Sequence, residues 1–161
     1  MSVIKNKRLS INELKSELAR LRKAGKTIAF TNGCFDILHF GHVSYLEKAK
    51  RGDRILVLGL NSDASIRKIK GAGRPIVPQR ERAGVLAALA SVDYVSIFSG
   101  QTPISLIKAV KPDVLIKGAD WKGKGIVGED FVKSYGGKVE YIKFEKGWST
   151  TRIVELIKKS A

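Results

Sequence analysis

Five short apolar segments, separated by stretches with helical periodicity, constrain the fold of this chain more than any other feature. They cover residues 27–30, 53–60, 93–98, 113–117 and 138–144. The second, DRILVLGL, is an almost continuous apolar run, which is typical of a parallel strand buried on both faces. Strands that alternate with helices form doubly wound sheets with right-handed crossovers. The sequence therefore predicts an α/β fold: a Rossmann-like, doubly wound, five-stranded parallel sheet with helices on both faces.

Both ends of the chain are predicted to be helical. Residues 10–13 form a capping box, and apolar residues then recur at helical spacing as far as Gly25. We expect residues 1–24 to form an amphipathic helix that packs on the chain or contacts a dimer partner. Three apolar residues of the last helix are expected to face the core: Ile153, Leu156 and Ile157.

Length and composition predict one domain over residues 1–161. A hydrophobic content of 43% can bury a core of the size usual for this length. The single cysteine excludes an internal disulfide, and the sequence has neither a signal peptide nor an apolar run long enough to span a membrane. We therefore expect a soluble cytoplasmic protein that needs no membrane partner.

The chain is strongly basic, with 30 Lys and Arg against 15 Asp and Glu and a net charge of +15. Such a charge suits a nucleic acid, or a small polyanion such as a nucleoside triphosphate. The lysines are spread along the whole chain, and the sequence has no zinc-finger spacing or RNA-binding aromatic signature. We expect a small anionic ligand and no nucleic acid, with a nucleic-acid-binding protein as the alternative.

Both histidines of the protein, His39 and His42, lie where the first predicted strand leads into a helix. The first N–H groups of a helix are unpaired and attract anions. Gly41, between the histidines, lets a phosphate come close to the backbone. Two histidines are too few for a three-histidine metal site. The segment predicts a phosphate site without a protein-bound metal.

The loops after strands one, two, four and five of the predicted sheet should converge at its carboxyl edge. They carry most of the unusual polar residues: His39, His42, Asn61, Asp63, Asp120, Trp121, Ser149, Thr150 and Thr151. Simpler roles compete for several of these. The hydroxyls and Asp63 can cap helices, and Trp121 can stack on a base or merely close the pocket. Cys34, in the loop after strand one, is most simply a small buried residue.

The motif His39-Phe40-Gly41-His42 resembles the His-x-Gly-His signature of the nucleotidyltransferase superfamily. Class I aminoacyl-tRNA synthetases have a similar motif but need a longer chain. Longer phrases resemble the branch of heptose 1-phosphate adenylyltransferases: TNGCFDILHFGH, GLNSDASIRKIKGAGRPI, ERAGVLAALASVDYV, PDVLIKGADW and GWSTTRI. The alternative is a cytidylyltransferase acting on another phosphorylated acceptor such as glycerol 3-phosphate. Phe144 disfavours it, since glycerol-3-phosphate cytidylyltransferase has a basic residue near that position.

The resemblance implies transfer of AMP from ATP to D-glycero-β-D-manno-heptose 1-phosphate, giving ADP-heptose and pyrophosphate. A separate kinase is expected to supply the acceptor, because this activity is often fused to a sugar kinase domain. Mg²⁺ is expected to arrive with ATP, held by phosphates and water, and the enzyme to be a homodimer.

The resemblance also implies roles for single residues. The catalytic residues are His39, His42 and Lys70. The nucleotide-binding residues are Thr31, Asn32, Gly33, Cys34, Phe35, Asp36, Gly41, Gly118, Asp120, Trp121, Gly147, Ser149, Thr150 and Thr151. The acceptor-binding residues are Asn61, Asp63, Lys68, Arg74 and Arg82.

Overall fold

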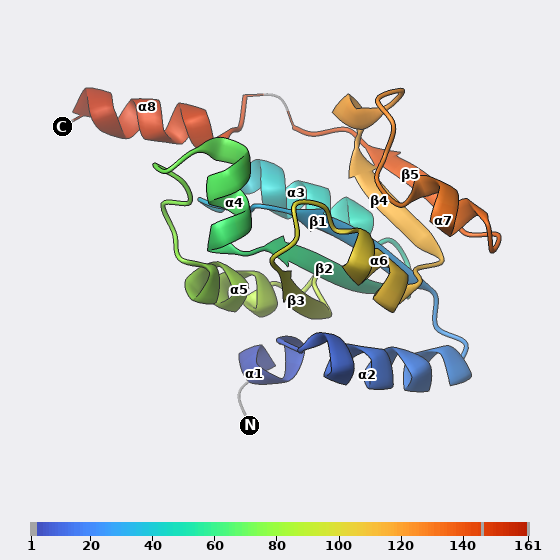
Figure 1. Cartoon of the computed structure of the whole chain (residues 1–161). Coiled ribbons are helices and arrows are strands. Elements are labelled where there is room, and N and C mark those ends of the chain that lie inside the picture. The colour runs from blue at the N-terminus through green and yellow to red at the C-terminus, as the bar shows by residue number, and fades with distance from the viewer. Residues whose placement is uncertain (1–2, 146, 161) are drawn as a thin grey trace.

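A five-stranded parallel sheet forms the centre of the protein in the computed structural model, which describes residues 3–145 and 147–160 (Figure 1). The strands are β1 (Ile28–Gly33), β2 (Ile55–Asn61), β3 (Tyr94–Phe98), β4 (Val114–Gly118) and β5 (Lys138–Ile142). Their order is β3-β2-β1-β4-β5, and every neighbouring pair is parallel. This confirms the predicted Rossmann-like sheet. The strand order reverses between β1 and β4, which is where such sheets bind ligands.

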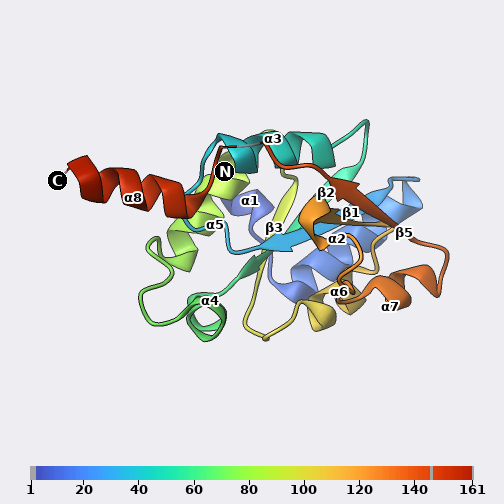
Figure 2. The ribbon, with the colours of Figure 1, turned by 90° about the horizontal axis from the view of Figure 1, so that it is seen from above.

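Helices cover both faces of the sheet (Figure 2). The helical elements are α1 (Val3–Lys7), α2 (Ile11–Lys23), α3 (Phe40–Ala49), α4 (Asp63–Lys70), α5 (Gln79–Ala88), α6 (Ile104–Val110), the 3₁₀ turn η1 (Ala119–Trp121), α7 (Glu129–Lys133) and α8 (Thr150–Ser160). One hydrophobic core lies between the sheet and α3 with α5, and a second lies between the sheet and α2, α6 and α7. Along β2, Leu56 and Leu58 enter the first core while Val57 enters the second, so this strand is buried on both faces as predicted.

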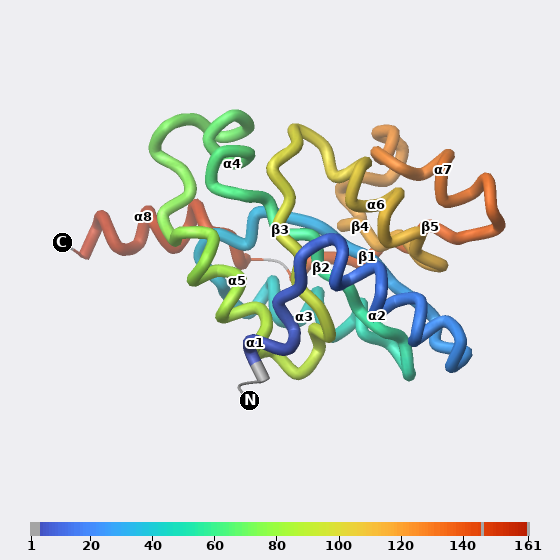
Figure 3. The backbone as a smooth tube through the Cα atoms, turned by 60° about the horizontal axis from the view of Figure 1, so that its bottom comes forward, coloured from blue at the N-terminus to red at the C-terminus, as the bar shows by residue number. Residues whose placement is uncertain are grey.

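The N-terminal amphipathic helix packs on its own chain. Ser10 and Glu13 form the predicted capping box, and the buried side of α2 is made by Leu14, Leu18 and Leu21. The short helix α1, which the sequence analysis did not separate from α2, lies against α5 (Figure 3). The described residues 3–24 therefore pack on their own chain, and the dimer-contact alternative stays a prediction.

The last helix does not pack as expected. In α8 no residue is buried, and the side chains of Leu156 and Ile157 are 54% and 59% exposed. The helix extends away from the sheet in Figures 1 and 2. The prediction that Ile153, Leu156 and Ile157 face the core is wrong. Helical periodicity identifies an apolar face, but it does not identify the surface that covers it.

Candidate active site

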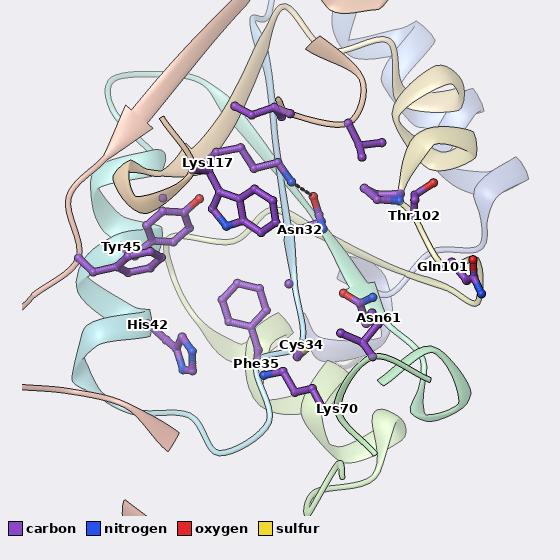
Figure 4. Close-up of a pocket in the computed structure, with 18 residues that line it drawn as sticks. Asn32, Cys34, Phe35, His42, Tyr45, Asn61, Lys70, Gln101, Thr102 and Lys117 are labelled. Carbon is purple, nitrogen blue, oxygen red and sulfur yellow. Dashed lines mark hydrogen bonds between the residues drawn. The ribbon is translucent and has the colours of Figure 1, made fainter. Parts of the chain in front are cut away.

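A cavity of about 520 Å³ lies at the carboxyl edge of the sheet, where β1 and β4 diverge (Figure 4). Half of the residues that line it were predicted as site residues: Asn32, Gly33, Cys34, Phe35, His42, Asn61, Lys70, Gly118 and Trp121. They come from the ends of β1, β2 and β4, from the segments that follow these strands, and from the end of α4. Phe144, which follows β5, also lines the cavity, so segments after all four strands named in the prediction reach the switch point, although the residues predicted after β5 do not.

The two histidines form a stacked pair at the start of α3. His39 is the N-cap residue, and its ring lies over that of His42 with the centroids 3.8 Å apart and the planes at 19°. His42 lines the cavity and its ring centroid is 5.1 Å from that of Phe35. Gly41 brings His39 and Trp148 close together, because a Cβ at position 41 would lie 3.1 Å from His39 Nδ1 and 3.0 Å from Trp148 Cβ. The pair is thus fixed by packing as well as by its place on the helix.

Burial favours the neutral form of both imidazoles. It lowers the pKa of His39, and it lowers the pKa of His42 to about 4, with smaller contributions from His39 and the positive charge of Lys70. A neutral imidazole donates one hydrogen bond. Among the described residues, the buried Nδ1 atoms of His39 and His42 have no hydrogen-bond partner. Unsatisfied buried groups of this kind are uncommon in folded proteins and often mark a functional site.

Asp36 and Arg74 bind each other instead of lining the cavity. The Asp36 carboxylate accepts hydrogen bonds from Arg74 Nη1 at 2.9 Å and from the backbone N–H groups of Ile76 and Val77 at 2.8 and 2.9 Å. Burial by itself would raise the pKa of Asp36, but these hydrogen bonds outweigh it and lower the pKa. This carboxylate ties the loop after β1 to the segment between α4 and α5. The sequence predicted ligand contacts for both residues, and the structure does not bring either to the cavity.

Arg82 does not line the cavity, but its fully buried side chain binds the backbone of two lining residues, Cys34 and Asn61. Its guanidinium donates to the carbonyl oxygens of Val77 at 2.8 Å, Cys34 at 2.6 Å and Asn61 at 2.9 Å, and to Asp63 Oδ1 at 2.7 Å. The loops after β1 and β2 are therefore joined through one side chain. Arg82 and Asp63 were predicted to bind the acceptor. In this structure they bind each other, and Ser62 supplies the α4 cap.

The cavity has two lysines and no acidic lining residue in the part of the chain that the structure describes. Lys70 reaches it from the end of α4, whereas Lys68 is exposed outside it. Lys117, on β4, was not predicted. Its Nζ donates to Asn32 Oδ1, and burial lowers its pKa to about 8. The sequence feature that could have identified Lys117 is its place at the end of a predicted apolar strand, DVLIK. Such a lining favours anionic ligands.

Aromatic side chains form the part of the cavity near β4 and β5. Phe144 stacks on Tyr45 with the ring centroids 5.0 Å apart, and the Tyr45 hydroxyl hydrogen bonds to the buried Thr31 hydroxyl at 2.8 Å. Gly118 is required here, because a Cβ would lie 2.1 Å from the Phe144 ring. Tyr45 and Phe144 were not predicted as site residues, and neither were the lining residues Ile69, Gln101, Thr102, Pro103, Ile126 and Val127. These are ordinary residues that only the fold brings together.

Residues 149–151 do not line the cavity. Ser149 Oγ accepts a hydrogen bond from the Arg152 N–H at 3.1 Å, and the Gly147 carbonyl accepts one from Arg152 Nη1 at 2.7 Å. Ser149 therefore caps the helix, which is the simpler of its two predicted roles. The segment nevertheless adjoins the start of α3, since the Trp148 ring packs edge-on against Phe40 with the centroids 5.7 Å apart. Phosphate binding by Ser149, Thr150 and Thr151 stays a prediction, as does ribose binding by the exposed Asp120.

Within residues 3–145 and 147–160, no three or more His, Cys, Asp and Glu side chains gather in a way that would hold a metal ion. The same residues contain no helix with the length and apolar character needed to cross a membrane.

Proteins with similar sequences match most of the chain. It is 56% identical over 136 residues to the bifunctional protein HldE of Syntrophotalea carbinolica, which covers 84% of this chain and 28% of the relative. It is 54% identical over 142 residues to bifunctional protein HldE of Campylobacter fetus subsp. fetus, covering 88% of this chain and 30% of the relative. The chain therefore spans less than a third of the length of these relatives.

Solved structures share the fold. A lipopolysaccharide core biosynthesis protein from Thermoplasma volcanium superposes with a TM-score of 0.59 at 25% identity, over 74% of this chain and 97% of that one. A pantoate-β-alanine ligase from Francisella tularensis superposes with a TM-score of 0.62 at 16% identity, over 94% of this chain and 76% of that one, which shows the fold alone.

The match to a family model spans nearly the whole sheet and the site. The model described as cytidylyltransferase-like matches residues 30–156, from β1 into α8. This confirms the prediction of a nucleotidyltransferase that was made from His39-Phe40-Gly41-His42 and the longer phrases. The chain belongs to the cytidylyltransferase-like family of enzymes.

Proposed function

We propose that this chain transfers AMP from ATP to D-glycero-β-D-manno-heptose 1-phosphate, with ADP-heptose and pyrophosphate as products. The observation that carries the proposal is the stacked histidine pair at the start of α3, of which His42 lines a cavity with two lysines and no acidic lining among the described residues. An environment of this kind stabilises phosphate groups without supplying a nucleophile.

The reaction follows from these groups. An oxygen of the acceptor phosphate attacks the α-phosphorus of ATP. A new P–O bond forms while the bond from the α-phosphorus to the oxygen shared with the β-phosphate breaks, and pyrophosphate leaves with that electron pair. His39 and His42 donate hydrogen bonds to the α-phosphate oxygens, where negative charge increases, and Lys70 neutralises the outer phosphates. The acceptor phosphate is already ionised near neutral pH, so positioning matters more than proton transfer.

The aromatic part of the cavity, with Tyr45, Trp121 and Phe144, suits a purine base. Resemblance of the longer phrases to heptose 1-phosphate adenylyltransferases supports ATP and the heptose acceptor. The relatives are named bifunctional, and this chain matches less than a third of their length. This is consistent with the chain carrying one of their two activities.

Magnesium enters the proposal with ATP. Asp36, the acidic residue nearest in sequence to the histidines, is occupied by Arg74 and two backbone N–H groups. The described residues that line the cavity thus include no carboxylate for an ion, and the phosphates and water would hold Mg²⁺. The ion would offset phosphate charge when bound.

The test mixes the purified chain with MgATP and D-glycero-β-D-manno-heptose 1-phosphate and measures ADP-heptose by mass spectrometry and pyrophosphate by a coupled assay. Both products are expected in equal amounts. A folded sample that gives neither refutes the proposal. Replacing ATP with CTP, and the heptose phosphate with glycerol 3-phosphate, distinguishes the cytidylyltransferase alternative, which predicts turnover only with the replacements.

We also propose a cytoplasmic homodimer that does not use nucleic acid. The exposed apolar residues Leu156 and Ile157 on α8 support a partner surface. Sedimentation equilibrium measures the oligomeric state, and a monomer at all concentrations would contradict the dimer. Binding to duplex DNA or single-stranded RNA that falls steeply with salt would contradict the absence of a nucleic-acid partner.

A further inference from the structure

Lys117 is a charged residue in the cavity to which the mechanism above gives no task. It lies next to the last residue of β4 and is partly buried. Its Nζ donates to Asn32 Oδ1, and among the described residues no carboxylate lies within 4.0 Å of it. A buried ammonium without an anionic partner is costly. An anionic group of a ligand would supply the missing partner.

Lys117 and the histidines belong to different faces of the sheet. Along β4, Ile116 enters the core beside α3 and Leu115 enters the core beside α6. Because side chains alternate along a strand, Lys117 shares the α6 face with Leu115. The histidines begin α3 on the other face. The cavity thus crosses the edge of the sheet, and its two lysines, Lys70 and Lys117, are its cationic lining residues among those the structure describes.

The half that contains Lys117 is also rich in neutral polar groups. In Figure 4 the Lys117 side chain points to Asn32, and Thr102 and Gln101 lie on the side of Asn32 away from His42 and Tyr45. Amides and hydroxyls suit a ligand with many hydroxyl groups. In the proposed reaction Lys70 and the start of α3 bind the phosphates of ATP. The phosphate of the acceptor is then the anionic group available to bind Lys117.

We propose that Lys117, oriented by Asn32, binds the phosphate group of the sugar phosphate acceptor, an inference that rests on the proposed function. It makes Lys117 a residue that recognises the acceptor and that no sequence motif identified. The phosphate would lie between the histidine half, where the α-phosphate is held, and the amide half, which would take the sugar hydroxyls.

The first test compares Lys117→Met with the wild type. Methionine keeps most of the length of the side chain and removes the charge. Loss of a charge-assisted hydrogen bond is expected to raise KM for the sugar phosphate about tenfold or more, with KM for ATP changed less than about twofold. Lys122→Met, an exposed lysine four residues from Gly118 in the following loop, is the matched control and is expected to leave both constants unchanged. Equal changes in both KM values, or none, would overturn the inference.

The pH dependence distinguishes binding from a structural role. Burial lowers the pKa of Lys117 to about 8, so the wild-type ammonium loses its proton as pH rises through that value. KM for the sugar phosphate is therefore expected to rise above pH 8 in the wild type. In Lys117→Met this rise is expected to be absent, and in Lys117→Arg, which stays charged, it should also disappear. A rise that persists in Lys117→Met contradicts the role.

A third measurement needs no turnover. Brief acetylation with acetic anhydride at pH 8, followed by mass spectrometry, reports how accessible each lysine is. Saturating heptose 1-phosphate is expected to protect Lys117, while ATP alone protects Lys70. If the wild type makes no ADP-heptose, the proposed function fails, and inorganic phosphate then serves as the probe. Protection of Lys117 by phosphate supports an anion site there, and equal labelling with and without it overturns the inference.

Discussion

Replacing Arg82 with methionine tests whether this residue supports the site or binds the acceptor, as the sequence first suggested. The guanidinium is fully buried, and it donates to three carbonyl oxygens and to Asp63. In Arg82→Met all four of these acceptors lose their hydrogen-bond donor. Breaking a buried, hydrogen-bonded ion pair on one side costs about 3–5 kcal/mol of unfolding free energy.

The expected loss lies toward the lower end of that range. The Asp63 side chain is 24% exposed, so water can solvate its carboxylate when Arg82 is removed. The three carbonyls, from residues 34, 61 and 77, are less accessible. A loss of about 3 kcal/mol corresponds to a decrease in Tm of about 6–12 °C for a chain of this size.

Urea unfolding followed by circular dichroism measures this free energy. Arg80→Met, on the exposed side of the same helix, is the matched control and is expected to change it by less than about 0.5 kcal/mol. Arg82→Lys keeps the charge but not the fork of donors, so an intermediate loss is expected. An Arg82→Met protein that unfolds within about 1 kcal/mol of the wild type, but has a raised KM for the acceptor, would refute the supporting role.

Three further predictions concern the site. His42→Ala should fold normally and lose at least about a hundredfold in kcat, because it removes a donor to the transition state; near-normal turnover would contradict this. Gly118→Ala should lose about 1–3 kcal/mol of unfolding free energy by urea unfolding, since its Cβ would lie 2.1 Å from Phe144, and Phe144→Ala should relieve most of that loss. Asp36→Asn should be less stable than the wild type at pH 7. Since the pKa of Asp36 is lowered on folding, this difference should shrink as pH falls below about 4, and a pH-independent difference would contradict it.

The sequence was sufficient for the sheet. A run such as residues 53–60 is apolar at successive positions, which only a strand covered on both faces requires, and alternation with helices then leaves few topologies. The pair His39 and His42 was also predictable, because a three-residue spacing at a helix start fixes their relation locally.

Other site residues were not predictable, because their roles depend on partners distant in sequence. Arg82 reaches Cys34 across 48 positions, and Lys117 reaches Asn32 across 85. Nothing near either residue distinguishes a ligand contact from an internal one. Asp36 and Arg74 show the same difficulty, since each was assigned to a substrate and they bind each other.

The sequence by itself determined the order of strands and helices along the chain, the histidine pair at a helix start and the family. These depend on periodicity and spacing over a few residues, which local sterics and burial control. Only the tertiary structure decided that α2 covers its own sheet while α8 leaves its apolar side exposed, that Arg82 binds the backbone of Cys34 and Asn61, and that Lys117 lines the cavity. Those outcomes depend on which surfaces and charges meet in space, and a buried charge takes its role from the groups that the fold places around it.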